Sequence, residues 1–189
     1  APRGVEVVRG TPSSIDDLRR AAEGAQAVAV ALNNGRASDN PWAKPTSPPA
    51  FMTDVARDTL DVMEENGIGR IVVVSALGVG DSWRTINPLF KAIVRGSNIR
   101  HGYRDHDGVD EVIRASDVDW TLVRAVALTD KPPTGPLRAA EAGTERPGLA
   151  VSRSEVARFL LDEIEQGTWT RRAPVIWNER RARGADQSA

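Results

Sequence analysis

The sequence predicts an α/β fold with a mainly parallel sheet. Apolar runs alternate with amphipathic helical segments along the chain, and the two clearest runs, residues 27–32 and 71–74, carry no polar side chain. Such runs are typical of parallel strands that helices cover on both faces. The chain has 189 residues, which corresponds to roughly one domain of about 100 to 200 residues.

The first elements follow from local patterns. Residues 5–8 are a short β-branched run, and two serines then precede a helix with apolar residues at helical spacing that ends at Gly24. The run at 27–32 predicts a strand buried on both faces. Residues 33–49 are rich in Asn, Ser and Pro and have no periodicity, so we expect a long loop at a strand end.

The middle of the chain repeats this alternation. Residues 50–66 carry apolar side chains on one helical face and end before Gly67, which predicts an amphipathic helix. A buried strand is predicted at 71–74. Residues 88–116 are mostly helical in pattern, and we expect an interruption near one of the two glycines in that segment.

The last third contains two strands and one helix. Residues 120–123 predict a strand, and polar segments with Pro and Gly continue to Gly148. Residues 152–155 have the Ser-x-x-Glu spacing of a capping box in front of an apolar helical face. Residues 174–177 predict a last strand, and the tail at 179–189 has the composition of a disordered segment.

Composition limits the partners. The sequence has 25 Lys and Arg against 26 Asp and Glu, a formal net charge of −1, so no overall positive field favours nucleic acid or acidic lipid. It has no cysteine, and no stretch approaches the ~20 apolar residues of a membrane span. We therefore expect a cytoplasmic protein with a small-molecule substrate and neither a nucleic acid nor a membrane partner; the oligomeric state stays open.

Several segments in order resemble one family. They are Val-Val-Arg-Gly at 7–10, Val-Val-Val-Ser-Ala at 72–76, Arg-Ala-Ser at 114–116 and Asp-Trp-Thr-Leu-Val-Arg at 119–124. This text is similar to the atypical short-chain dehydrogenase/reductase proteins of the NAD(P)H-binding, NmrA-like kind, nearest to the flavin reductase and biliverdin-IX-beta reductase branch. The resemblance implies a Rossmann-like, doubly wound, three-layer α/β fold that binds NADP or NAD across the carboxyl ends of its strands.

The sequence departs from that family at its start. Such proteins begin with a strand, a Gly-rich turn and a helix that bind the pyrophosphate, and no such segment is present here. We expect the domain at 1–178 to lack its first βαβ strands, an absence of roughly 30 to 40 residues on the size of such a unit. The strands at 5–8 and 27–32 would then not pair directly.

Three residues are predicted to be catalytic. Ser75 ends the clearest strand, where a hydroxyl can donate to a nicotinamide carboxamide or a substrate carbonyl. The family's usual Tyr and Lys pair is absent: His106 falls at the Lys position, and Tyr103, the only tyrosine, lies three residues before it. With an ordinary pKa near 6.5, His106 could hydrogen-bond the cofactor or transfer a proton, and Tyr103 is the weaker candidate for a general acid.

The resemblance also places cofactor contacts. Arg36 and Arg153 are further cations that could meet a ligand, and Trp42 and Trp83 could line the pocket of a flat aromatic substrate. No metal site is expected, because the two histidines are five residues apart and do not share a helix face. The predicted cofactor-binding residues are Gly10, Thr11, Asn33, Asn34, Gly35, Ser75, Ala76, His106, Arg124, Ala125 and Val126.

Three functions remain open from the sequence. The first is an NAD(P)H-dependent oxidoreductase that reduces a flavin, a quinone or another carbonyl-type acceptor. The second is a non-catalytic NmrA-like protein that senses dinucleotides or regulates a partner, which the missing Tyr and Lys pair favours slightly. The third is a chain that binds no dinucleotide because the phosphate loop is absent.

Overall fold

The computed structural model of the chain describes residues 4–179. A five-stranded sheet has the order β1-β2-β3-β7-β5, in which β1, β2, β3 and β7 are parallel and β5 is antiparallel to β7. The predicted Rossmann-like α/β fold with a mainly parallel sheet is thus confirmed. The strands are β1 (Val28–Val30), β2 (Arg70–Ala76), β3 (Asp119–Ala125), β5 (Leu137–Ala140) and β7 (Val175–Asn178).

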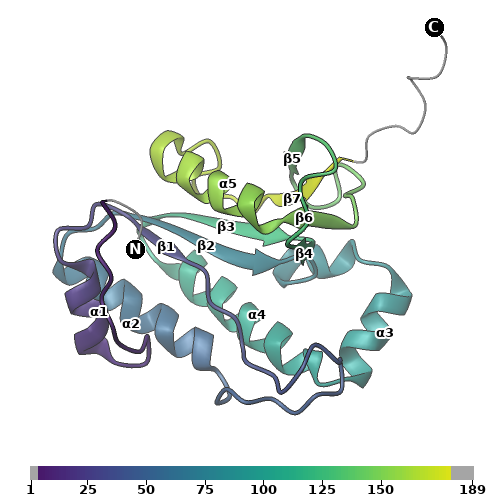
Figure 1. Cartoon of the computed structure of the whole chain (residues 1–189), viewed down its shortest axis with the longest axis horizontal. Helices are drawn as coiled ribbons and strands as arrows, with labels where there is room; N and C mark the ends of the chain where they lie inside the picture. The colour runs from purple at the N-terminus through teal and green to yellow at the C-terminus, as the bar shows by residue number, and fades with distance from the viewer. Residues whose placement is uncertain (1–3, 180–189) are drawn as a thin grey trace, which may run out of the picture.

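Helices cover both faces of this sheet (Figure 1). One face packs on α1, α2 and α4, the other packs on α5, and α3 lies beyond the carboxyl ends of the strands. A small second sheet pairs β4 (Ala127–Thr129) with β6 (Ala150–Ser152). The helices are α1 (Ile15–Ala22), α2 (Phe51–Glu65), α3 (Pro88–Gly96), α4 (Ile99–Ala115) and α5 (Arg153–Gln166), with a 3₁₀ turn, η1, at Gly80–Arg84.

Local capping explains where α1 and α5 begin. Ser14 and Ser152 are N-cap residues whose hydroxyls accept hydrogen bonds from the backbone N–H three residues later. The predicted helical segment at 88–116 is interrupted directly after Gly96, where α3 ends; two residues follow before α4 begins at Ile99. These starts and stops agree with the sequence patterns because caps and breakers act within one turn.

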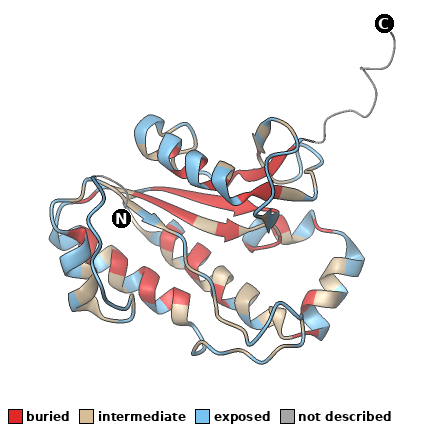
Figure 2. Ribbon diagram, in the orientation of Figure 1, coloured by how far each residue is buried: buried red, intermediate tan, exposed pale blue. Residues whose placement is uncertain are grey.

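The hydrophobic core has two layers, one on each side of the sheet (Figure 2). Ile71, Val73 and Leu122 pack toward α1, α2 and α4, whereas Val72 and Val123 pack toward α5. Buried residues therefore make up all of β3 after Asp119 and most of β2, as expected for central parallel strands. The two strands form a rigid base for the loops at their carboxyl ends.

Two predictions at the start of the chain need correction: the strand at 5–8 is wrong, and the strand at 27–32 forms but is shorter and is not buried on both faces. Residues 5–8 form no strand, and Val5 and Val7 are 55% and 64% exposed. The strand predicted at 27–32 is reduced to β1, whose middle residue Ala29 is exposed. In the described part of the chain, β1 pairs only with β2, so no strand covers its other side. Residues 5–8 pair with no strand. Both segments therefore lack a neighbour that would bury their backbone and side chains. The two segments do not pair with each other.

Two further predictions concern the C-terminal tail and membrane-spanning segments. The disordered tail predicted at 179–189 lies outside the described residues except for Glu179. Within residues 4–179, no helix combines the length and the apolar composition that crossing a membrane requires.

Candidate functional site

The carboxyl ends of β1, β2 and β3 meet at one edge of the sheet, where open α/β sheets bind ligands. A cavity of about 470 Å³ lies there, between the strand ends and the start of α5. We call it the strand-end cleft. Its walls are mostly apolar, and it is lined by Ala31, Leu32, Asn33, Val74, Ser75, Ala76, His106, Ala125, Val126, Leu128, Arg153, Val156, Ala157 and Leu160.

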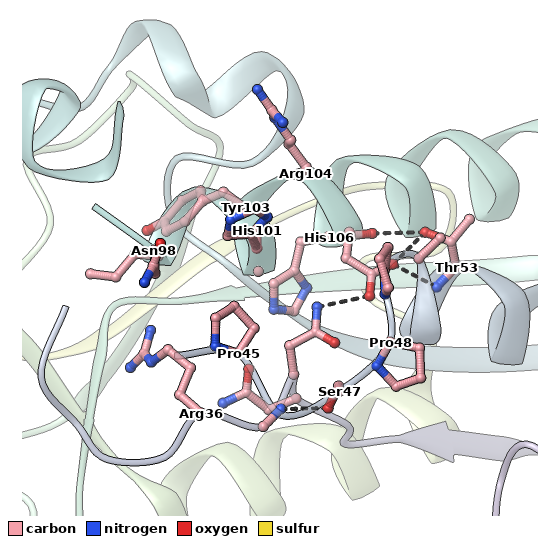
Figure 3. A pocket seen from close by; sticks show the side chains of 18 of the residues that line it. Arg36, Pro45, Ser47, Pro48, Thr53, Asn98, His101, Tyr103, Arg104 and His106 are labelled. Atoms are coloured by element: carbon pink, nitrogen blue, oxygen red, sulfur yellow. Dashed lines mark hydrogen bonds between the residues drawn. The ribbon is translucent and has the colours of Figure 1, made fainter. Parts of the chain in front are cut away.

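A second cavity of about 550 Å³ lies between the loop after β1 and the first turns of α4 (Figure 3). We call it the loop pocket. Its walls include Asn34, Arg36, Pro45, His101 and Tyr103, and it shares Asn33, Ala76 and His106 with the strand-end cleft. The two cavities therefore meet at His106.

Ser75 carries a buried hydroxyl in the strand-end cleft. The residue is 4% exposed, and its Oγ forms no hydrogen bond in the structure. Nearly all buried polar atoms in proteins have a partner, so an unpaired buried hydroxyl at a strand end is consistent with a group that bonds a ligand. Ser75 lies where the sequence predicted it.

His106 projects from α4 between the two cavities. Burial lowers the pKa of the imidazole, and the nearby Asp105 carboxylate opposes that shift to a smaller extent. The side chain is consequently neutral near pH 7, with one N–H donor and one acceptor nitrogen. The imidazole is thus suited to hydrogen bonding rather than to carrying a positive charge.

Tyr103 has a different surrounding. Its hydroxyl donates to the carbonyl of Leu77 at 3.1 Å, and its ring packs edge-on against Trp83 and Phe90. Burial, followed by the charge of Asp107, raises the pKa of Tyr103 to about 12. This geometry gives Tyr103 a packing role and leaves Ser75 and His106 as the candidates for chemistry.

Asp105 organises the site and was missed by the sequence analysis. Its carboxylate, 3% exposed, accepts hydrogen bonds from the backbone of Met52 (2.8 Å) and Thr53 (2.9 Å), the Thr53 hydroxyl (2.6 Å) and the Asn34 amide (2.8 Å). Burial alone would raise the pKa of Asp105, but the hydrogen bonds from Thr53, Met52 and Asn34 outweigh it and lower the pKa.

Asp105 thereby supplies the cap that α2 lacks locally. Ala50, the N-cap residue of α2, has no side chain that can accept a hydrogen bond. A carboxylate from α4 takes these N–H groups, so the positive end of α2 is already paired with an anion. Only one feature of the local sequence indicates this capping role: Asp105 is an acidic residue on the buried side of a helix, directly before His106.

The structure divides the predicted cofactor residues into two groups. Asn33, Asn34 and Gly35 line the loop pocket, and Ser75, Ala76, His106, Ala125 and Val126 line the strand-end cleft. Gly10 and Thr11 line neither cavity: the backbone N–H of Thr11 donates to Asp17 at 2.8 Å, which fixes the turn before α1.

Arg124 also differs from its predicted role. Its guanidinium is fully buried, forms an ion pair with Asp110 at 3.0 Å and a second ion pair with Asp81. The side chain is committed to these carboxylates and does not line the cleft. Trp42 and Trp83 line neither cavity, and residues 4–179 contain no group of three acidic or His side chains that could hold a metal ion.

The residues present fit one half of a dinucleotide well. The apolar cleft and the unpaired Ser75 hydroxyl suit a flat ring that carries a polar carboxamide. Among the described residues, no Gly-rich helix start is present to bind the phosphates. The N–H groups at the start of α2 are also occupied, because they already bind Asp105. Among the predicted cofactor-binding residues, Asn33 and Asn34 carry the polar side chains that line the loop pocket and could serve that part of the cofactor.

This sheet order, with a cleft at the strand ends, defines the class of NAD(P)H-binding oxidoreductase-like Rossmann folds. The sequence matches the NAD(P)H-binding family over residues 1–167, so the chain belongs to that family. Among curated protein sequences, none is significantly similar to it.

Solved structures agree with this fold. ChuY, an anaerobilin reductase from Escherichia coli O157:H7, is 18% identical with a TM-score of 0.73, and the match covers 96% of this chain and 79% of ChuY. A short-chain dehydrogenase/reductase from Veillonella parvula, crystallised with NADP, is 15% identical with a TM-score of 0.73 and coverages of 92% and 72%. A Rossmann-fold NAD(P)-binding family protein from Shigella flexneri is 16% identical with a TM-score of 0.64 and coverages of 97% and 78%.

Proposed function

We propose that this protein is an NAD(P)H-dependent reductase of a small, flat acceptor such as a flavin, a quinone or another carbonyl compound. The observation that supports this most is the buried Ser75 hydroxyl, which lacks a partner at the carboxyl edge of β2 and lies beside His106 in the strand-end cleft. The reductase activities of similar proteins, ChuY among them, are consistent with the proposal.

The side chains would act by positioning and by excluding water. A bound nicotinamide supplies the hydride, so the protein itself needs no strong acid or nucleophile. The Ser75 hydroxyl donates to a carboxamide or carbonyl oxygen, and the neutral His106 holds a second hydrogen bond from α4. The apolar walls of the cleft align the two rings. The proton that accompanies the hydride comes from solvent and adds to an oxygen of a quinone or carbonyl acceptor, or to a ring nitrogen of a flavin.

A second candidate function is a non-catalytic, NmrA-like sensor that binds dinucleotide without turnover. One observation favours it: the only tyrosine donates its hydroxyl to the carbonyl of Leu77. The phenol is therefore not available at the position where the usual enzymes of this class have a catalytic tyrosine.

Binding and turnover separate these functions. The chain is first titrated with NADPH and with NADH by fluorescence, and a panel of flavins and quinones is then assayed for NAD(P)H oxidation. We expect saturable binding and steady turnover, with kcat/KM reduced about tenfold in Ser75→Ala and in His106→Ala, the effect of losing one hydrogen bond of about 1.4 kcal/mol.

A matched control is Ser116→Ala, which removes a serine hydroxyl after α4 at the opposite edge of the sheet. This variant should keep the kcat/KM of the unmodified protein. Saturable binding without turnover would support the sensor instead. A folded chain that binds neither nucleotide would contradict both functions.

A further inference from the structure

The loop pocket has an excess of positive charge. Two arginines, Arg36 and Arg104, belong to its lining, whereas Asp105 is its only carboxylate. Both oxygens of that carboxylate already accept two hydrogen bonds each, from Met52, Thr53 and Asn34. The pocket therefore contains no acidic group that is available to neutralise a cation.

Arg36 is the cation that faces this pocket from the loop side. Among the ion pairs within residues 4–179, none involves Arg36, and its Nε is buried without a hydrogen-bond partner. Figure 3 shows the side chain next to Pro45 and opposite Asn98, whereas Arg104 points away from them. An unpaired buried donor is costly, and a ligand acceptor would remove that cost.

The backbone around Arg36 is held in place. The N–H of Gly35 donates to the Ser47 hydroxyl at 2.7 Å, the N–H of Thr46 donates to the carbonyl of Gly35 at 2.9 Å, and the N–H of Ala37 donates to the carbonyl of Lys44 at 3.0 Å. These hydrogen bonds join two parts of the loop, residues 35–37 and 44–47, on both sides of Arg36. The guanidinium is presented by a defined turn rather than by an irregular segment.

A second buried atom in the pocket also lacks a partner. The Asn34 amide donates to Asp105, but its Oδ1 accepts no hydrogen bond. The pocket thus offers a positively charged donor on Arg36 and a neutral acceptor on Asn34. Flat apolar surfaces of Pro45 and Tyr103 line the same space.

We propose that the loop pocket binds the carboxylate of an aromatic acceptor, with Arg36 as its ion-pair partner. The assignment rests on the proposed reductase function, because the two cavities meet at His106 and an aromatic ring in the loop pocket can extend toward Ser75. A cavity of about 550 Å³ is of the size that encloses such a molecule, and arginine binds carboxylates in a two-pronged geometry. Substrates of this class are flat, aromatic and acidic.

The test measures binding without requiring turnover. Calorimetric titrations compare 2-naphthoate with its uncharged methyl ester, on the unmodified chain, on Arg36→Gln and on Arg36→Lys. We expect Kd for 2-naphthoate to rise about tenfold or more in Arg36→Gln, the loss of a charged hydrogen bond. Arg36→Lys should show a smaller rise, and Kd for the methyl ester should not change.

Arg57→Gln is the matched control, because Arg57 is an exposed arginine on α2 that pairs with Asp54 away from both cavities. Its Kd for 2-naphthoate should equal that of the unmodified chain. Circular dichroism on each variant confirms that the fold is kept. A Kd for 2-naphthoate that does not depend on Arg36 would overturn the proposal.

The NADPH affinity of Arg36→Gln separates two sources of the anion. If this variant weakens NADPH and leaves 2-naphthoate unaffected, the anion is a cofactor phosphate and the proposal is wrong. If Arg36-dependent binding of 2-naphthoate occurs without turnover of any acceptor, the carboxylate site stands and the reductase function fails. If neutral quinones are reduced but 2-naphthoate does not bind, the reductase function stands and the carboxylate site fails.

Discussion

The buried polar side chains at the carboxyl ends of β2 and β3 differ in whether they have partners within the protein. Ser75 on β2 and Arg124 on β3 are partners in the register of the two strands, and they are 4% and 0% exposed. The guanidinium of Arg124 forms ion pairs with Asp110 and Asp81, whereas the Ser75 hydroxyl has no partner. The two side chains are thus similarly buried, but only Arg124 forms ion pairs within the protein.

The end of β3 is closed by its own charges. Asp110 also pairs with Arg114, and the backbone N–H of Gly80 at the start of η1 donates to Asp107 at 2.8 Å. This network holds the η1 turn against α4 by ion pairs and one backbone hydrogen bond, although the Arg124 Nε and Nη1 atoms form no hydrogen bond. A polar residue at a strand end is therefore structural where carboxylates from other elements reach it.

The end of β2 is open by comparison. Three buried atoms around it lack partners: the Ser75 Oγ, the Asn34 Oδ1 and the Arg36 Nε. Unpaired buried atoms are uncommon in folded proteins, and these three line two cavities that join at His106. The difference between the two strand ends is consistent with the proposed ligand site at β2 and with a structural anchor at β3.

The largest effect should come from breaking the anchor. Arg124→Met removes one of the two arginines that pair with the buried Asp110, and the removal of one member of a buried ion pair costs about 3 to 5 kcal/mol. We expect the free energy of unfolding to fall by about that amount in urea titrations, with an unchanged m value. Asp81→Asn, whose side chain is 70% exposed, should cost about 1 kcal/mol or less. A loss below about 1 kcal/mol for Arg124→Met would show that the β3 end is not an anchor.

His106, near the carboxyl end of β2, should make the free energy of unfolding depend on pH. Burial holds its folded pKa below the unfolded value near 6.5, so the unfolded chain binds more protons as the pH falls through that value. The free energy of unfolding of the unmodified protein should therefore decrease from pH 7.5 toward pH 5. In His106→Gln this part of the pH dependence should disappear.

The control for that measurement is His101→Gln, because His101 is exposed on the same helix. It should retain the pH dependence of the unmodified protein. Thermal unfolding at several pH values records the three curves side by side. Parallel curves for the unmodified protein and His106→Gln would mean that His106 is solvated at the junction of the cavities.

Much of the fold could be predicted because it depends on local patterns. The strands at 71–74 and 120–123 and the caps at Ser14 and Ser152 are specified by residues within one turn or one run. The failures depend on pairing. Residues 5–8 have strand-forming side chains but no neighbouring strand, whereas β5 has little β-branched character and becomes a strand because it pairs with β7.

The candidate site could be predicted only in part. Ser75 and His106 follow from a strand end and a family resemblance, and both line the cleft. Asp105 and Arg36 gain their roles from contacts, or missing contacts, across distant parts of the chain. Arg124 was predicted to bind the cofactor because the sequence does not reveal that Asp110 reaches it. Which buried polar atoms remain unpaired is a property of the three-dimensional arrangement.

The sharpest comparison has the smallest expected effect. Ser75 and Ser82 are both buried, but the Ser82 hydroxyl donates to the carbonyl of Val79 at 2.7 Å and accepts from the N–H of Gly78 at 2.9 Å. Ser82→Ala should therefore cost about 1 to 3 kcal/mol, while Ser75→Ala should change the free energy of unfolding by less than about 0.5 kcal/mol. Urea titrations of both variants measure the difference. If Ser75→Ala is as destabilising as Ser82→Ala, the Ser75 hydroxyl has a protein partner in solution, and it is not reserved for a ligand.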